Sequence, residues 1–181
     1  AVIVSEALYP NYSVSGNYIS DLGVGPSSAI FNTSVFLMGL LLVIGAYFLQ
    51  RAFHFELLTA MVVLTAVGAM GVGIFTKDFI TIHTVVSFIA FVFGGLAAIF
   101  AAICSYVHKF PLVKMPFSAL SIILGLLTLG ALGLFVGKIY LGLGVGGMER
   151  IVAYPVLMWG AGFGGYLIAH PEIGTTEQKP Q

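Results

Sequence analysis

Five apolar stretches, each about as long as a lipid bilayer is thick, constrain this chain more than any other feature of its sequence. They cover residues 28–50, 55–75, 79–105, 115–137 and 151–169, and the only charged residue inside them is Glu56, near the start of the second. A membrane-spanning α-helix needs about 20 predominantly apolar residues. Only 8% of all residues are charged, whereas soluble domains carry about 25%. The sequence therefore predicts an all-α integral membrane helical bundle.

The segments around these stretches complete the predicted domain. Residues 1–4 are apolar, which indicates the end of a membrane helix that precedes the first complete one. We therefore expect five complete transmembrane helices plus the end of a preceding one, in a single domain of residues 1–171. Residues 172–181 are polar and predict a disordered tail. Residues 8–27 and 138–147 are rich in turn-forming residues and indicate loops or, for the second segment, a re-entrant turn.

The two sides of the predicted bundle differ slightly in their number of basic residues. Those on the side of the tail are Arg51, Lys109, Lys114 and Lys179, and those on the opposite side are Lys77, Lys138 and Arg150. Cytoplasmic loops carry the excess of Lys and Arg in multi-pass membrane proteins. The bias therefore predicts a cell-membrane protein with a cytoplasmic tail. The chain start and the turns that hold Asp21, Asp78 and Glu149 are then expected outside.

Polar residues gather in three short turns on the predicted outer side. The candidate catalytic residues are Asp21, Asp78, His83, Glu149 and Arg150, and a structural polar cluster around them comprises Ser20, Asn32 and Ser87. Three interpretations remain open. The cluster caps and pairs the helix ends, it holds a metal or general base at Asp78 and His83, or it binds a lipid headgroup or a partner.

Two of these side chains require partners near the membrane. An imidazole one turn inside a membrane helix needs a polar neighbour, and for His83 we expect Ser87, Asp78 or Asp21. Arg150 does not suit the start of a helix, so it needs a carboxylate, for which Asp21 and Asp78 are the candidates. Glu149 suits the helix start that we expect at this point.

The charge, the cysteine content and short sequence motifs limit the kinds of function that we expect. The net charge is zero, which gives no electrostatic case for nucleic acid, and Cys104 is the only cysteine, so no disulfide framework is expected. Asn11-Tyr-Ser is a candidate glycosylation site. Glycine and alanine recur within the apolar stretches, for example at residues 68–73, and predict close helix contacts. No cofactor is predicted, and bound lipid is expected.

The motifs on the outer side carry a resemblance. They read LYPNYSVSGNYISDLG at residues 8–23, FN at 31–32, GIFTKD at 73–78 followed by His83, and GMERI at 147–151. This pattern resembles the polytopic membrane family catalogued as domain of unknown function 998, which is common in archaea and bacteria. The resemblance covers nearly the whole chain. It implies a helical bundle with a helix before the first motif, and it implies no established activity.

Three functions are compatible with the sequence. The first is an accessory or structural subunit that packs against lipids, against another membrane protein or against itself, because few residues face water and many helix faces are small. The alternative is an intramembrane, metal-dependent hydrolase of lipid headgroups. There Asp21, Asp78 and His83 would hold a metal-activated water, and Arg150 would bind an anionic group. The second alternative is a passive carrier or channel for small solutes.

Overall fold

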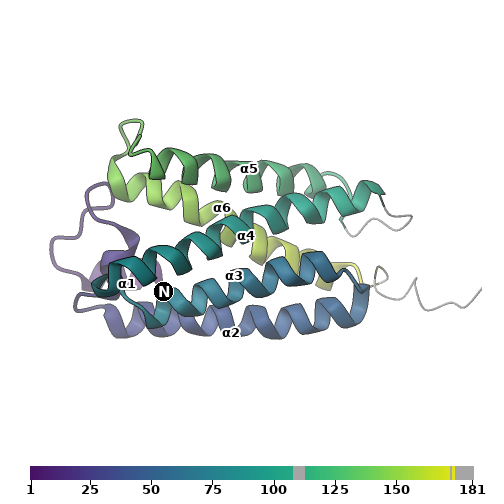
Figure 1. The fold of residues 1–181 in the computed structure, drawn as a ribbon, viewed down its shortest axis with the longest axis horizontal. Helices are drawn as coiled ribbons and strands as arrows, with labels where there is room; N and C mark the ends of the chain where they lie inside the picture. The colour runs from purple at the N-terminus through teal and green to yellow at the C-terminus, as the bar shows by residue number, and fades with distance from the viewer. Residues whose placement is uncertain (108–112, 172, 174–181) are drawn as a thin grey trace, which may run out of the picture.

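The computed structural model describes residues 1–107, 113–171 and 173, and in these ranges the chain is helical, with no strand. The elements are α1 (Val2–Leu8), η1 (Ile19–Gly23), α2 (Ser28–Phe53), α3 (Glu56–Ile74), η2 (Lys77–Phe79), α4 (Ile80–Val107), α5 (Phe117–Val136) and α6 (Gly144–Ala169). Five of them, α2 to α6, are long and apolar enough to cross a membrane. The predicted all-α bundle is confirmed (Figure 1). The predicted tail lies outside the described residues except for Ile173, which is buried.

Consecutive long helices pack as neighbours, from α2 to α6, and α6 returns to contact α4. Figure 1 shows α4 and α5 close together at one end of the bundle and diverging towards the end that holds α1. We call the α1 end the polar end, because it carries α1, η1, η2 and the start of α6. Residues 9–27, which connect α1 to α2, fold over this end, and we call them the cap.

The last helix begins earlier than predicted. We expected residues 138–147 to form a flexible loop or a closely packed re-entrant turn and the helix to start at about residue 151, but α6 starts at Gly144. The predicted helix start was wrong because Gly144 and Gly146 serve close contact rather than flexibility. A Cβ added to Gly144 would lie 2.3 Å from the Ser15 carbonyl oxygen, and one added to Gly146 would lie 2.0 Å from the Asn17 carbonyl oxygen. The cap therefore lies directly on the first turn of α6, and Glu149 and Arg150 belong to the second turn.

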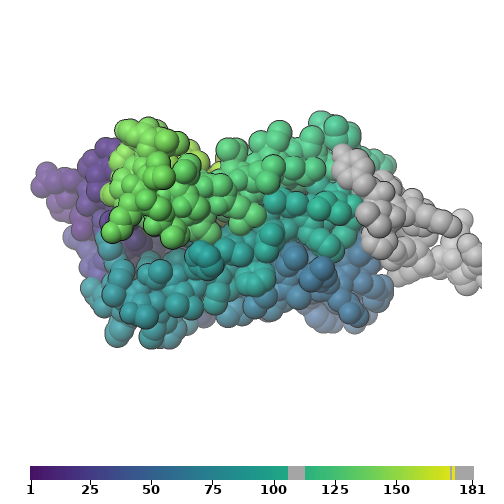
Figure 2. All heavy atoms as spheres, turned by 45° about the horizontal axis from the view of Figure 1, so that its top comes forward, coloured from purple at the N-terminus to yellow at the C-terminus, as the bar shows by residue number. Residues whose placement is uncertain are grey.

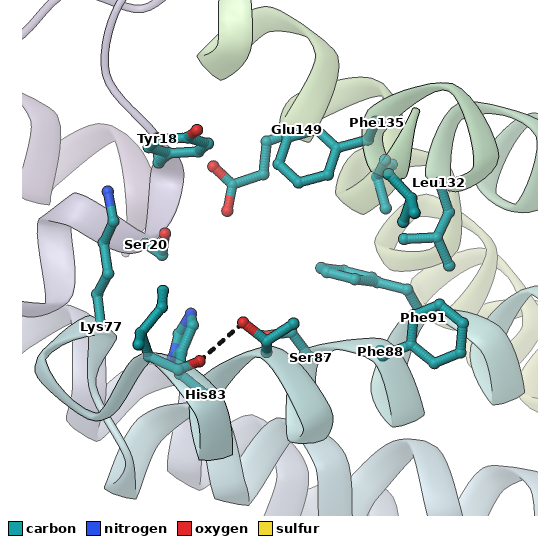
Figure 3. Close-up of a pocket in the computed structure, with 14 residues that line it drawn as sticks. Tyr18, Ser20, Lys77, His83, Ser87, Phe88, Phe91, Leu132, Phe135 and Glu149 are labelled. Carbon is teal, nitrogen blue, oxygen red and sulfur yellow. Dashed lines mark hydrogen bonds between the residues drawn. The ribbon is translucent and has the colours of Figure 1, made fainter. Parts of the chain in front are cut away.

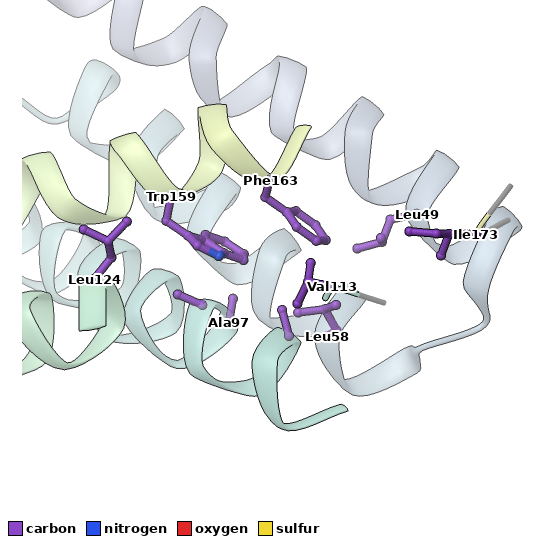
Figure 4. Close-up of a cluster of buried hydrophobic side chains, with 10 residues drawn as sticks. Leu49, Leu58, Ala97, Val113, Leu124, Trp159, Phe163 and Ile173 are labelled. Carbon is purple, nitrogen blue, oxygen red and sulfur yellow. The ribbon is translucent and has the colours of Figure 1, made fainter. Parts of the chain in front are cut away.

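The interior is built from small residues where helices cross and from larger ones near the end opposite the cap. Figure 4 shows the larger cluster, in which Trp159 and Phe163 of α6 lie near Leu58 of α3 and Leu49 of α2. The Trp159 ring stacks on Phe163 with 5.1 Å between ring centroids. Its Nε1–H donates to the Ser121 hydroxyl at 3.1 Å. A buried indole N–H needs such a partner, so this bond fixes α6 against α5.

Glycines set the distance between helices, as predicted from their frequency. A Cβ on Gly68 of α3 would lie 2.7 Å from the Val86 carbonyl oxygen of α4, and one on Gly125 of α5 would lie 2.6 Å from the Gly95 carbonyl oxygen of α4. Lipid tails are as apolar as the side chains, so packing must replace the hydrophobic drive between membrane helices. Close backbone contact at these positions supplies that packing.

Replacing Gly68 with alanine tests the close contact of α3 with α4. The added methyl meets backbone atoms that cannot move aside, and overpacking of this kind costs about 1–3 kcal/mol. We expect a lower midpoint of thermal unfolding in detergent. The matched control is Gly130→Ala, since a Cβ at Gly130 has nothing within 4 Å. That variant should unfold at or above the wild-type temperature because alanine favours helix by about 1 kcal/mol. Equal effects of both changes would contradict the packing account.

Candidate functional site

The cap is a folded element rather than a loose loop. We predicted turns for residues 8–27, and the cap does contain turns, but its centre is the 3₁₀ helix η1, whose Leu22 side chain is fully buried. Ser27 donates its hydroxyl to the Leu22 carbonyl oxygen at 3.1 Å. The amide of Asn32, in the first turns of α2, donates to the Gly23 carbonyl oxygen at 2.9 Å. Asn32 therefore belongs to the polar end as a structural residue that holds the cap.

Arg150 attaches the cap and α1 to α6. Its guanidinium donates to the Val14 carbonyl oxygen at 2.8 Å and to the Tyr12 hydroxyl at 2.9 Å, and it forms an ion pair with Glu6 of α1. The side chain is buried. We expected Asp21 or Asp78 as its carboxylate partner, and this prediction was wrong. Glu6 was expected on the same side of the membrane as Arg150, but its pairing with Arg150 was not predicted.

Tyr12 connects this pair to the rest of the cap. Its hydroxyl accepts from Arg150 and donates to the Tyr18 carbonyl oxygen at 2.8 Å. Burial raises the pKa of the Tyr12 phenol above its ordinary value, although the hydrogen bond from Arg150 opposes the shift. The phenol therefore stays protonated, as donation to a carbonyl requires.

Glu149, one residue before Arg150, holds the start of η1. Its Oε2 accepts the Ile19 backbone N–H at 2.5 Å, and the Ser20 backbone also donates to this carboxylate. These bonds satisfy N–H groups that a helix start leaves free. Glu149 was expected to complement the start of its own helix. It instead complements the start of another helix, because it lies in the second turn of α6 and faces the cap.

Asp21 and Lys77 form a second ion pair, which joins the cap to η2. The other Asp21 oxygen accepts the Tyr18 backbone N–H at 2.9 Å. The Lys77 ammonium also lies 3.9 Å from the centre of the Tyr18 ring, a cation–π contact. Each charge of this pair therefore has an opposite charge beside it. Sequence reasoning counted Lys77 only for membrane orientation and did not consider Glu6, Tyr12 or Tyr18 as functional side chains.

His83 has a partner that the sequence did not suggest. Its Nδ1 lies 2.8 Å from the Phe75 carbonyl oxygen at the end of α3, whereas Ser87, Asp78 and Asp21 were expected. Helix α3 ends at Ile74, so the carbonyl of Phe75 is free to accept. A carbonyl oxygen only accepts, which places the proton of a neutral imidazole on Nδ1 and leaves Nε2 as an acceptor. The ring is buried, with 8% of its surface exposed.

Asp78 stands apart from these residues. It is exposed at η2, and its carboxylate accepts from the Thr76 hydroxyl at 3.4 Å. Within the described ranges, no group of three His, Cys, Asp or Glu side chains is close enough together to hold a metal ion. The structure thus does not bring Asp78 and His83 together with Asp21. Asn11 is exposed on the cap, and its glycosylation remains a prediction.

One cavity lies beneath the cap, between α4, α5 and α6, with a volume of about 250 Å³. Its polar side chains come from η1, η2, α4 and α6, and they include Ser20, Lys77, His83, Ser87 and Glu149. Figure 3 shows the Glu149 carboxylate and the His83 ring on opposite sides of this space, with Ser20 between them and the apolar side chains farther along α4 and α5. The cavity therefore unites four of the predicted polar residues, which are Ser20, His83, Ser87 and Glu149.

The cavity opens where the helices diverge. A hollow separates the light-green surface of the α5–α6 turn from the teal surface of α4 (Figure 2). Phe88 and Val136, which line the cavity from α4 and α5, are themselves exposed. Both α4 and α5 are long and apolar enough to cross a membrane, and the opening lies between them near the polar end.

Replacing Arg150 with glutamine tests whether this residue holds the cap. Breaking a buried ion pair by removing one partner costs about 3–5 kcal/mol. We expect a lower thermal midpoint in detergent and faster chymotrypsin cleavage after the cap tyrosines Tyr12 and Tyr18. Arg51→Gln is the control, because Arg51 is exposed at the other end of α2. Wild-type stability and protease resistance in the Arg150 variant would contradict this role.

The comparisons with known proteins identify a family for the chain. No curated protein and no solved structure matches the chain. A family model described as "Protein of unknown function (DUF998)" matches residues 1–165, a range that includes the cap, all five long helices to within a few residues of the end of α6, and every cavity residue named above. The resemblance noted from the sequence motifs is thereby confirmed, and the chain belongs to the DUF998 family.

Proposed function

We propose that this protein binds a membrane amphiphile by its polar head, in the cavity beneath the cap. The observation that carries this proposal is the change from polar to apolar side chains along the lining of the cavity. Hydrogen-bonding side chains line the end near the cap, whereas Phe88, Phe91 and Leu132 line the part that extends along α4 and α5 (Figure 3). Ligand sites are typically apolar with a few placed polar groups, and this gradient matches a molecule with a polar head and an apolar tail.

The size and position of the cavity favour a head with the first part of a chain. Its volume of about 250 Å³ is at the lower end of ligand pockets, which span about 300–1,000 Å³. A complete lipid does not fit inside it. Phe88 and Val136 line the cavity and are exposed on the outer surface of the bundle, so the remaining chain can leave the cavity between α4 and α5. The sequence led us to expect bound lipid and a protein that packs against lipids or other membrane proteins, and the proposed cavity is a site for such a lipid.

The alternatives receive less support. A metal-dependent headgroup hydrolase was expected to use Asp21, Asp78 and His83, but Asp21 is paired with Lys77 and Asp78 is exposed. A passive carrier or channel needs a polar path through the helices. The hydroxyls of Thr65 and Ser121 instead donate to carbonyls of their own helices. Association with another membrane protein or with a second copy of the chain remains a prediction.

Orientation is a further part of the proposal. We infer that the polar end faces the outside of the cell membrane and that the short connection at residues 54–55 faces the cytoplasm, on the distribution of basic residues. Cysteine labelling tests this in a Cys104→Ser background. Val14→Cys, at an exposed cap position, should react with a membrane-impermeant maleimide in intact cells. His54→Cys should react only after the membrane is opened. The reverse pattern would contradict the orientation.

Filling the cavity tests the proposed function. Ser87 of α4 lines the cavity and has a small side chain, so Ser87→Trp places an indole where the head of the ligand is expected. Native mass spectrometry of the purified protein should show a lipid-sized adduct on the wild type and its loss from this variant. The control is Val85→Trp, on the same helix at an exposed position outside the cavity. A folded Ser87→Trp variant that keeps the adduct would sink the proposal.

A further inference from the structure

We infer that the head bound in the cavity is a primary ammonium group, as in an aminophospholipid. This inference rests on the proposed function and specifies the class of ligand. It starts from the charges that border the cavity. Lys77 is paired with Asp21, and Arg150, which does not line the cavity, is paired with Glu6. Among the residues that the structure describes, Glu149 has no such partner, although it lines the cavity.

The environment of Glu149 makes an unpaired carboxylate costly. Its surroundings include Phe135 and Leu132, and it lies in the second turn of a helix able to cross the membrane. Ionisable groups at such positions are usually paired, and they mark sites where substrates or ions bind. The backbone N–H groups of Ile19 and Ser20 donate to the carboxylate without neutralising it. A cationic ligand would supply the missing positive charge.

Apart from Lys77, which is paired with Asp21, the cavity offers further hydrogen-bond acceptors. The Nδ1 of His83 is bound to the Phe75 carbonyl oxygen, which leaves Nε2 as the acceptor of a neutral imidazole. Figure 3 places the His83 ring across the cavity from Glu149. A primary ammonium has three N–H donors. The Glu149 carboxylate, the His83 imidazole and the hydroxyl of Ser20 or Ser87 offer matching acceptors on different sides of one space.

Aromatic rings at the same end favour a cation further. Tyr18 and Phe135 both line the cavity, and their rings make an edge contact with 6.0 Å between centroids. Tyr18 already accepts the Lys77 ammonium on its ring face, so the Phe135 ring offers the additional surface. Cations bind favourably over aromatic faces, more so away from water. An anionic head such as phosphoglycerol would instead place its charge beside an unneutralised carboxylate.

The experiment is a headgroup comparison with the full chain. Purified protein is placed in nanodiscs that contain phosphatidylethanolamine, phosphatidylcholine or phosphatidylglycerol with identical acyl chains. The protein is then released from the nanodiscs, and the lipid molecules that stay bound to it are counted by native mass spectrometry. We expect phosphatidylethanolamine to bind about 10-fold more tightly than phosphatidylglycerol, a difference of about 1.4 kcal/mol, because hydrogen bonds between charged groups are stronger than neutral ones. Phosphatidylcholine, whose nitrogen has no N–H, should fall below phosphatidylethanolamine.

Variants assign the preference to Glu149. Glu149→Gln keeps an oxygen for the Ile19 N–H but removes the charge, and it should abolish the preference for phosphatidylethanolamine. Asp78→Asn is the matched control, because it removes one carboxylate from the same end of the molecule at an exposed position outside the cavity. It should keep the wild-type preference. If Glu149→Gln does not fold, the three-lipid comparison on the wild type still decides the matter.

The outcomes separate the two proposals. Retained lipid without headgroup preference, or with a preference for phosphatidylglycerol, would overturn the ammonium assignment and leave lipid binding intact. Equal loss of preference in Asp78→Asn would also overturn it, because the effect would then not belong to the cavity. Competition by soluble ethanolamine as strong as by the lipid would assign the site to a free amine. No retained lipid of any kind would contradict the proposed function itself.

Discussion

The interaction on which the polar end depends is the set of contacts between Arg150 and the segments before α2. One guanidinium binds a carboxylate of α1, a phenol of the cap and a carbonyl of the cap. These groups lie far from Arg150 in sequence, so no local preference brings them together. A charge buried near a membrane boundary is stable only when it is fully paired. Arg150 therefore fixes the position of the cap, and the cap in turn forms the roof of the cavity.

Glu149, the residue before Arg150, lies in the same turn of α6 but has a different role. Glu149 accepts hydrogen bonds from the first residues of η1 and also borders the cavity. The glycines one turn earlier let the backbone of the cap approach α6 to a distance that no side chain would permit. The first two turns of α6 thus combine a close backbone contact at Gly144 and Gly146, a cavity-lining carboxylate at Glu149 and the attachment point of the cap at Arg150.

The sequence predicted the long helices well and the polar end only in part. Runs of apolar residues specify α2 to α5 nearly to their ends, because a bilayer imposes the length and the polarity of each span. The start of α6 was misplaced because glycine signals both flexibility and close contact, and only the position of the cap distinguishes the two. Of the candidate site residues, Ser20, His83, Ser87 and Glu149 meet at one cavity. The partners of Arg150 and His83 were missed because Glu6 and the Phe75 carbonyl become neighbours only through the folding of the cap and the end of α3.

The most direct test of the central claim is photo-cross-linking with a phosphatidylethanolamine that carries a diazirine on the acyl carbons next to its head. The account predicts labelled peptides concentrated on the cavity-facing parts of α4 and α5, around Phe88 and Val136, and their loss in Ser87→Trp. Label spread evenly over the lipid-facing surfaces of all five long helices, unchanged in that variant, would show that lipid merely surrounds the protein and would contradict the account.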